Sequence, residues 1–210
     1  NYDFVLIDTS PSASSIINAL LVISSNYFIA PVSPSFFSLQ AVDNLSTIFQ
    51  NWTNLFDGYE KTTWNPYWLT MSVKFLGIVV KHEKRFNGWW NSNMDGFSAS
   101  TEDWITNVNK SVKKFQIDAI RKWFAIDESE FVSIFWDKSL PFIIEKCCDF
   151  TPQLRSVAES EWIPVIYLTQ EICKKHNPQI DITSEAAQYF KSFHQINSAY
   201  RGIANGLLKL

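Results

Sequence analysis

Short apolar runs alternate with longer stretches of helical periodicity along this chain. Continuous apolar runs this short are typical of strands that are buried on both faces of a parallel sheet. Such runs predict strands at residues 4–7, 27–32, 75–80 and 142–144. Since helices are predicted between these strands, the pattern predicts an α/β fold, a mainly parallel sheet with helices on both faces.

The predicted helices have apolar residues three and four positions apart, the spacing that gives a helix one core-facing side. They cover residues 14–23, 36–56, 100–115 and 151–160. Asp57 and Gly58 are expected to end the second of them. A last helix, capped by Thr183 or Ser184, is expected to run to the end of the sequence.

Residues 82–140 are expected to form an α-rich insertion within a single domain spanning residues 1–210. Aromatic residues make up 16% of the chain, and Trp89 and Trp90 lie in a part of this stretch that has no periodicity. Two interpretations of these aromatic residues stay open: they pack beneath the insertion, or they form a surface that binds a partner.

Composition narrows the classes of protein that fit. The formal net charge of −3 does not indicate a generally basic surface for nucleic acid. Three cysteines without C-x-x-C spacing predict neither a zinc site nor a disulfide framework, and they fit a reducing cytoplasm. Apolar stretches fall short of the roughly 20 residues that a membrane span requires.

Asp8 is the first candidate for chemistry, because it directly follows the apolar run at residues 4–7. Ligands of open α/β sheets bind beyond the carboxyl ends of the strands, where this carboxylate would stand. The alternative is a structural role, in which Asp8 caps the next helix or accepts hydrogen bonds from amides of the following turn.

Residues 2–12, Tyr-Asp-Phe-Val-Leu-Ile-Asp-Thr-Ser-Pro-Ser, resemble the ParA/MinD family of deviant P-loop ATPases. The similarity continues through residues 17–20, 28–34, 37–41, 75–80 and 148–150. Two positions depart from the family's pattern: Ser10 replaces the first proline of the second switch, and Cys148 replaces the proline before Asp-Phe.

The resemblance implies a nucleotide site that uses ATP and Mg²⁺. Asp8 would be the catalytic Walker B aspartate, which holds a water molecule of the Mg²⁺ shell and does not bind the ion directly. The backbone at Pro11 and Ser12 would sense the γ-phosphate, and Asp149 and Phe150 would flank the adenine.

The phosphate-binding loop of this family is not found in the sequence. None of the six glycines is followed by lysine, so no G-x-x-x-x-G-K-[ST] motif exists. The chain is therefore expected to be the C-terminal part of a longer ATPase, or an ATPase that has lost its front. Alone, it is not expected to hydrolyse ATP.

The resemblance implies a cytoplasmic ATPase that dimerises on ATP and positions DNA or other cargo in plasmid or chromosome partition. A partner protein would stimulate hydrolysis, and any DNA binding is expected to be weak and non-specific. The alternative is a non-catalytic, ATPase-like module whose aromatic-rich insertion binds a partner protein. An aspartyl-nucleophile phosphatase is set aside, because Ser10 occupies the position where its second aspartate is required.

Overall fold

A computed structural model describes residues 4–9, 16–60, 73–82, 99–121, 124–136, 140, 142–148, 150–185 and 187–210. In chain order the elements are α1 (Ile16–Ile23), β1 (Tyr27–Val32), α2 (Phe36–Glu60), β2 (Lys74–His82), α3 (Ala99–Arg121), α4 (Glu128–Phe135), β3 (Ile143–Cys148), α5 (Pro152–Glu161), the 3₁₀ helix η1 (Val165–Tyr167), α6 (Gln170–His176) and α7 (Gln188–Leu207). Among these described elements, no helix has the length and apolar character needed to cross a membrane.

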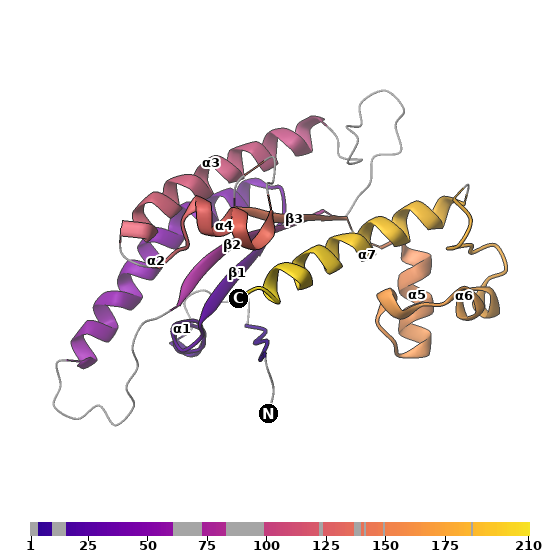
Figure 1. The fold of residues 1–210 in the computed structure, drawn as a ribbon, viewed down its shortest axis with the longest axis horizontal. Coiled ribbons are helices and arrows are strands. Elements are labelled where there is room, and N and C mark those ends of the chain that lie inside the picture. The colour runs from indigo at the N-terminus through magenta and orange to yellow at the C-terminus, as the bar shows by residue number, and fades with distance from the viewer. Residues whose placement is uncertain are drawn as a thin grey trace.

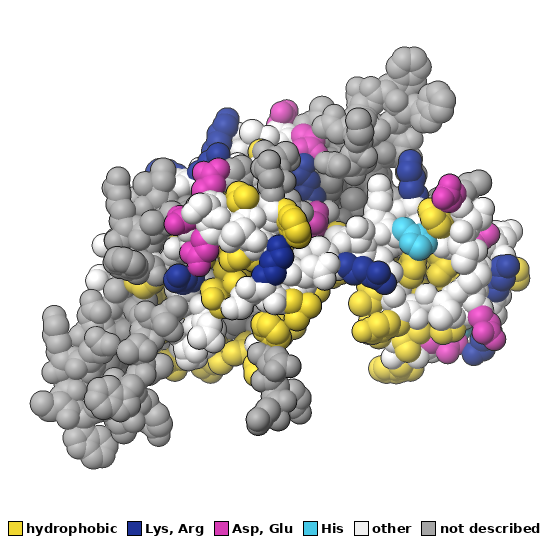
Figure 2. All heavy atoms as spheres, in the orientation of Figure 1, with side chains coloured by type: hydrophobic (Ala, Val, Ile, Leu, Met, Phe, Trp, Pro, Cys, Tyr) yellow, Lys and Arg dark blue, Asp and Glu magenta, His cyan; other side chains and the backbone are white. Residues whose placement is uncertain are grey.

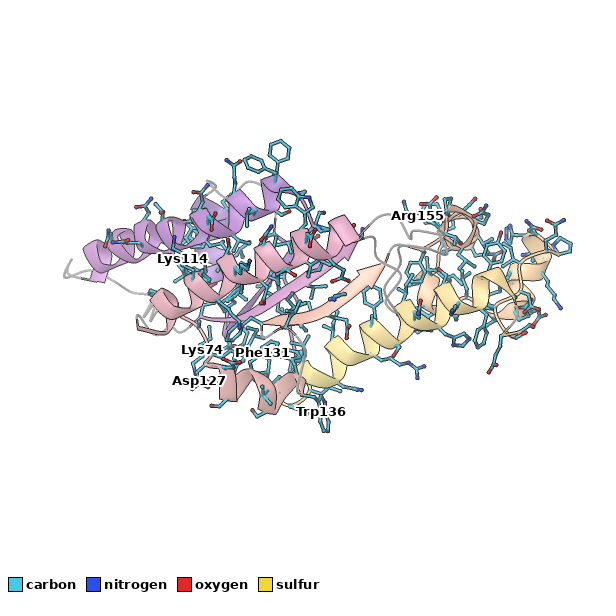
Figure 3. All side chains as sticks on the ribbon, turned by 90° about the horizontal axis from the view of Figure 1, so that it is seen from above. Lys74, Lys114, Asp127, Phe131, Trp136 and Arg155 are labelled. Atoms are coloured by element: carbon cyan, nitrogen blue, oxygen red, sulfur yellow. The ribbon has the colours of Figure 1, made fainter. Side chains whose placement is uncertain are left out.

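The described strands form an open sheet in the order β1-β2-β3, and both neighbouring pairs are parallel. Helices α2 and α3 lie on one side of the sheet, while α4 and α7 lie on the other (Figures 1 and 3). The prediction of an α/β fold with a parallel sheet and flanking helices is therefore confirmed.

Aromatic rings fill the core between the sheet and α2–α3. Phe75 of β2 is fully buried, and its ring centroid lies 5.1 Å from that of Phe115 on α3 and 5.6 Å from that of Phe28 on β1. Phe49 of α2 packs against Phe28, Phe115 and Phe124. For Phe115 and Phe124, which lie between β2 and β3, the packing interpretation is confirmed.

The predicted strand at residues 4–7 is wrong. The segment lies outside the sheet with exposed side chains: 49% for Phe4, 76% for Val5, 86% for Leu6 and 46% for Ile7. A strand that is apolar on both faces needs paired neighbours and covering helices, and no described strand pairs with this segment. Hydrophobic side chains consequently gather along the lower border of the sheet body in Figure 2.

Several boundaries differ from those predicted. Helix α2 continues through Asp57 and Gly58 to Glu60, because a glycine near a helix end costs only about 1 kcal/mol. The predicted caps of the last helix are wrong, since α7 begins after Ala187. The backbone N–H groups of Thr183 and Ser184 instead donate to Oδ1 of Asp181, at 2.8 and 3.1 Å.

A second, smaller core joins α5, α6 and the first part of α7. Its buried residues include Leu154, Cys173 and Phe193, while Ile203 and Leu207 farther along α7 pack against the main core. Helix α7 therefore connects the two cores, as Figure 1 shows. Burial raises the pKa of the Cys173 thiol, which fits the expected structural role of this cysteine.

Two glycines of α7 are expected to respond differently to alanine substitution. A Cβ at Gly206 would lie 2.3 Å from the ring of Phe135, whereas at Gly202 the nearest atom is Oε2 of Glu145 at 3.1 Å. We expect Gly206→Ala to lower the free energy of unfolding by about 1–3 kcal/mol through overpacking. Gly202→Ala should be neutral or stabilising by up to about 1 kcal/mol, because the Glu145 side chain can move and alanine favours helix.

Urea unfolding of the two variants beside the wild type measures this difference. Equal stability of both variants would show that α7 does not approach Phe135 as closely as the structure indicates.

Candidate functional site

The candidate site lies at the carboxyl edge of the sheet, where parallel strands bring their ends together. At the end of β1, the Ser33 N–H donates to Oγ of Ser38 at 3.2 Å, and the Ser38 N–H donates to Oγ of Ser35 at 3.4 Å. These hydroxyl groups fold the chain from β1 into the first turn of α2, so that the amino end of this helix stands at the same edge.

An ion pair holds β3 near its end. The Lys146 ammonium lies 3.2 Å from Oε2 and 3.4 Å from Oε1 of Glu102 in the first turn of α3. Only 18% and 19% of the two side chains are exposed, so solvent screens this pair less than a surface pair. The sequence analysis did not identify the pair, and its only local signal was the charged Glu145-Lys146 dipeptide within a predominantly apolar strand.

The chain leaves β3 and reaches Phe150 just before α5. The Phe150 ring lies nearly parallel to that of Tyr200 on α7, with an interplanar angle of 3° and centroids 6.4 Å apart. Tyr200 is 45% exposed, and Phe150 is half-buried. The two rings offer a flat apolar surface of the kind that bases pack against.

Thr151, which follows Phe150, caps α5 without a side-chain hydrogen bond. Its Oγ1 is buried and has no hydrogen-bond partner within the described part of the chain. Leaving a buried hydroxyl unsatisfied costs about 1–3 kcal/mol, which makes this turn a place where a new hydrogen bond would be favourable.

The other residues predicted for the site are placed only in part. Asp8 lies at the exposed segment before α1 and follows no strand in the structure. Pro11, Ser12 and Asp149 lie outside the described residues, so their roles stay predictions. The structure thus places Phe150 beside an aromatic partner and leaves the phosphate side of the site undescribed.

Mg²⁺ fits these residues only in an outer-shell arrangement. Within the described ranges, no group of three or more His, Cys, Asp or Glu side chains could hold a metal ion. Asp8 is a single exposed carboxylate, and such a group can hold a water molecule of a hydrated Mg²⁺ ion, which gives up its waters reluctantly. Direct ligands would have to come from other residues.

Phe150→Ala tests whether this ring contacts a nucleotide base. In the complete protein we expect the variant to bind ATP more weakly by about 1–2 kcal/mol, because base–aromatic packing contributes this much. Titration of ATP combined with thermal unfolding measures affinity and stability separately. Tyr167→Ala, at an exposed ring of η1, is the control. A lower melting temperature with unchanged ATP affinity would show that Phe150 serves packing alone.

Comparison with known proteins adds one finding. A family model described as an AAA domain matches residues 1–57, which include Asp8, α1, β1 and most of α2. No curated protein and no solved structure matches the chain. The match supports a P-loop NTPase-like, nucleotide-binding character for the first 57 residues of this α/β chain.

Proposed function

We propose that this chain is part of a ParA-like ATPase that dimerises when it binds ATP and positions DNA or other cargo. The observation that carries the proposal is Asp8, which follows an apolar run inside the 57 residues that the AAA-domain model matches. The parallel sheet supports it, since nucleotides commonly bind at the carboxyl edge of such sheets. The half-exposed pair Phe150–Tyr200 supplies a surface for the base near that edge.

Each residue has a separate part in the proposed site. Asp8 orients a water molecule of the hydrated Mg²⁺ ion, and the backbone at Pro11 and Ser12 responds to the γ-phosphate. Asp149 and Phe150 contact the adenine. When bound, Mg²⁺ neutralises negative charge on the phosphate oxygens. The amide-lined phosphate loop and its lysine belong to a segment outside this chain, because no glycine here precedes a lysine.

A second candidate is a non-catalytic, ATPase-like module that binds a partner protein through aromatic side chains. Trp136, between α4 and β3, favours it because this ring is 69% exposed (Figure 3). The Lys209 ammonium lies 3.9 Å from the centroid of the ring, which leaves the opposite ring face for another contact.

Recovery of the upstream sequence, followed by ATP titration and turnover measurements on the complete protein, separates the two candidates. A lysine-bearing P-loop, ATP binding in the presence of Mg²⁺ and measurable turnover are expected for the ATPase. A degenerate loop and no ATP binding would exclude it and favour the module.

DNA binding by the complete, ATP-bound protein is expected to be weak, salt-sensitive and independent of sequence. Lys113 and Lys114 are exposed on α3, and Figure 3 labels Lys114. By contrast, Lys175 is paired with Glu161, and Lys209 donates to carbonyl groups at the end of α4. The exposed pair on α3 is therefore the first to test. Replacing both lysines by alanine should lower the salt dependence of binding by about one to two phosphate contacts.

The measurement is a titration of a random duplex at low and moderate salt, with the Lys175→Ala variant as control. This chain without its upstream sequence should show no measurable DNA binding. Tight binding by this chain, or a sequence preference, would contradict the proposal and indicate a DNA-reading domain.

A further inference from the structure

We propose that Glu102 and Lys146 position the base-binding turn at residues 149–150, and that they thereby set the contribution of the adenine to nucleotide affinity. This role rests on the proposed function, since it concerns the same nucleotide site. Both residues are positioning residues, because they act on the turn through β3 and not through contact with the nucleotide.

The first step is the position of the ion pair along the strand. Lys146 lies two residues before Cys148, where β3 ends, and its register partner on β2 is Val80. The ammonium contacts both carboxylate oxygens of Glu102, 44 positions earlier in the sequence. A displacement of Lys146 would move the end of β3, and with it the turn that follows.

The second step is the opposite side of the strand. Successive side chains of a strand point to opposite faces, and Glu145 faces α7, where its Oε2 lies 3.1 Å from the Cβ position of Gly202. After the turn, Phe150 lies against Tyr200 of the same helix. The turn is therefore held from one face through α3 and from the other through α7, which cover opposite faces of the sheet (Figure 3).

The third step is the strength of the link. A chelated ammonium with about four-fifths of both side chains covered has a more defined geometry than an exposed pair. The Lys74–Glu130 pair provides the contrast, since its partners lie 3.5 Å apart and are 42% and 39% exposed. Lys74 is the first residue of β2 and thus belongs to the amino edge of the sheet (Figure 3).

The experiment compares two ligands on the complete protein: Mg²⁺-ATP, and inorganic tripolyphosphate, which has no base. For Glu102→Gln and for Lys146→Met we expect the affinity for ATP to fall about tenfold, as small displacements of a positioning group can do. The affinity for tripolyphosphate should stay within about twofold of the wild type, because the phosphate contacts are unchanged. The double variant should be no worse than either single variant, since one interaction is lost in all three.

Lys74→Met is the matched control and should change neither affinity. Thermal unfolding of each variant shows whether a general loss of structure is responsible, since such a loss would weaken both ligands alike and would overturn the positioning role. Unchanged ATP affinity in both single variants, with normal binding by the wild type, would overturn it as well. If the wild-type protein binds neither ligand, the proposed ATPase function fails, and this inference fails with it.

Discussion

Gly77→Ala is expected to lower the free energy of unfolding by at least about 3 kcal/mol. Gly77 has a φ of +145°, a conformation that side-chain-bearing residues adopt only at a cost of about 1–3 kcal/mol. A Cβ at this position would also lie 2.6 Å from the carbonyl oxygen of Phe142. The two effects add, because the strain lies in the residue itself and the clash involves a neighbouring backbone atom.

The surroundings of Gly77 leave little room for relaxation. The Phe142 carbonyl accepts a hydrogen bond from the Ile78 N–H at 2.9 Å, so moving this oxygen away would break a buried contact. Phe28 pairs with Phe75 while Ile29 pairs with Gly77, so β2 contains an extra residue at this point. Glycine permits this irregularity between two paired strands.

Urea unfolding of Gly77→Ala and the wild type measures the loss, with Gly202→Ala as the control for adding one methyl group at a glycine. A variant that does not fold at all would agree with the expectation, and circular dichroism of the purified protein would show it. A loss below about 1 kcal/mol would mean that β2 does not have the irregular register described above.

The strands that the sequence predicted correctly are those whose partners lie within the chain. Residues 27–32 and 75–80 are apolar, and β1 and β2 occupy these positions as paired strands. Residues 4–7 have the same composition but form no strand. Local composition reports that a segment favours burial in a sheet, and it contains no information on whether a neighbouring strand is present.

The two helices that the sequence analysis missed are short. Helices α4 and α6 have eight and seven residues, which gives little periodicity to detect. Their caps were the available signal: Asp127 accepts from the Glu130 N–H at 2.8 Å, and Thr169 accepts from the Ile172 N–H at 3.3 Å. At Thr183 the same logic failed, because Asp181 binds the amides there, and these hydrogen bonds lower the pKa of Asp181.

The site divides in the same way. Asp8 and Phe150 could be proposed from sequence because they lie within short motifs that resemble a family. Glu102 and Lys146 could not, since a contact between residues 44 positions apart depends on how α3 crosses the sheet. Tyr200 was predicted as part of the buried face of the last helix, yet 45% of it is exposed, and its ring lies beside Phe150.

Asp8→Ala is expected to reduce ATP turnover by the complete protein at least about a hundredfold while its fold is retained. A carboxylate that orients a metal-bound water is a small part of the structure, but its loss misplaces the ion that neutralises the phosphate charge. The side chain is exposed, so its removal creates no cavity. Asp8→Asn should be similarly defective, because the amide has nearly the same shape but lacks the charge.

The alternative role of Asp8 predicts the opposite pattern, which makes the experiment decisive. If Asp8 only caps α1 or the turn before it, the alanine variant should melt at a lower temperature and retain near-normal turnover, and asparagine, itself a good cap, should restore the melting temperature. Asp43→Ala, which removes an exposed carboxylate from α2, controls for the change in net charge. Steady-state turnover and thermal unfolding of the three variants therefore distinguish a carboxylate that serves catalysis from one that serves the fold.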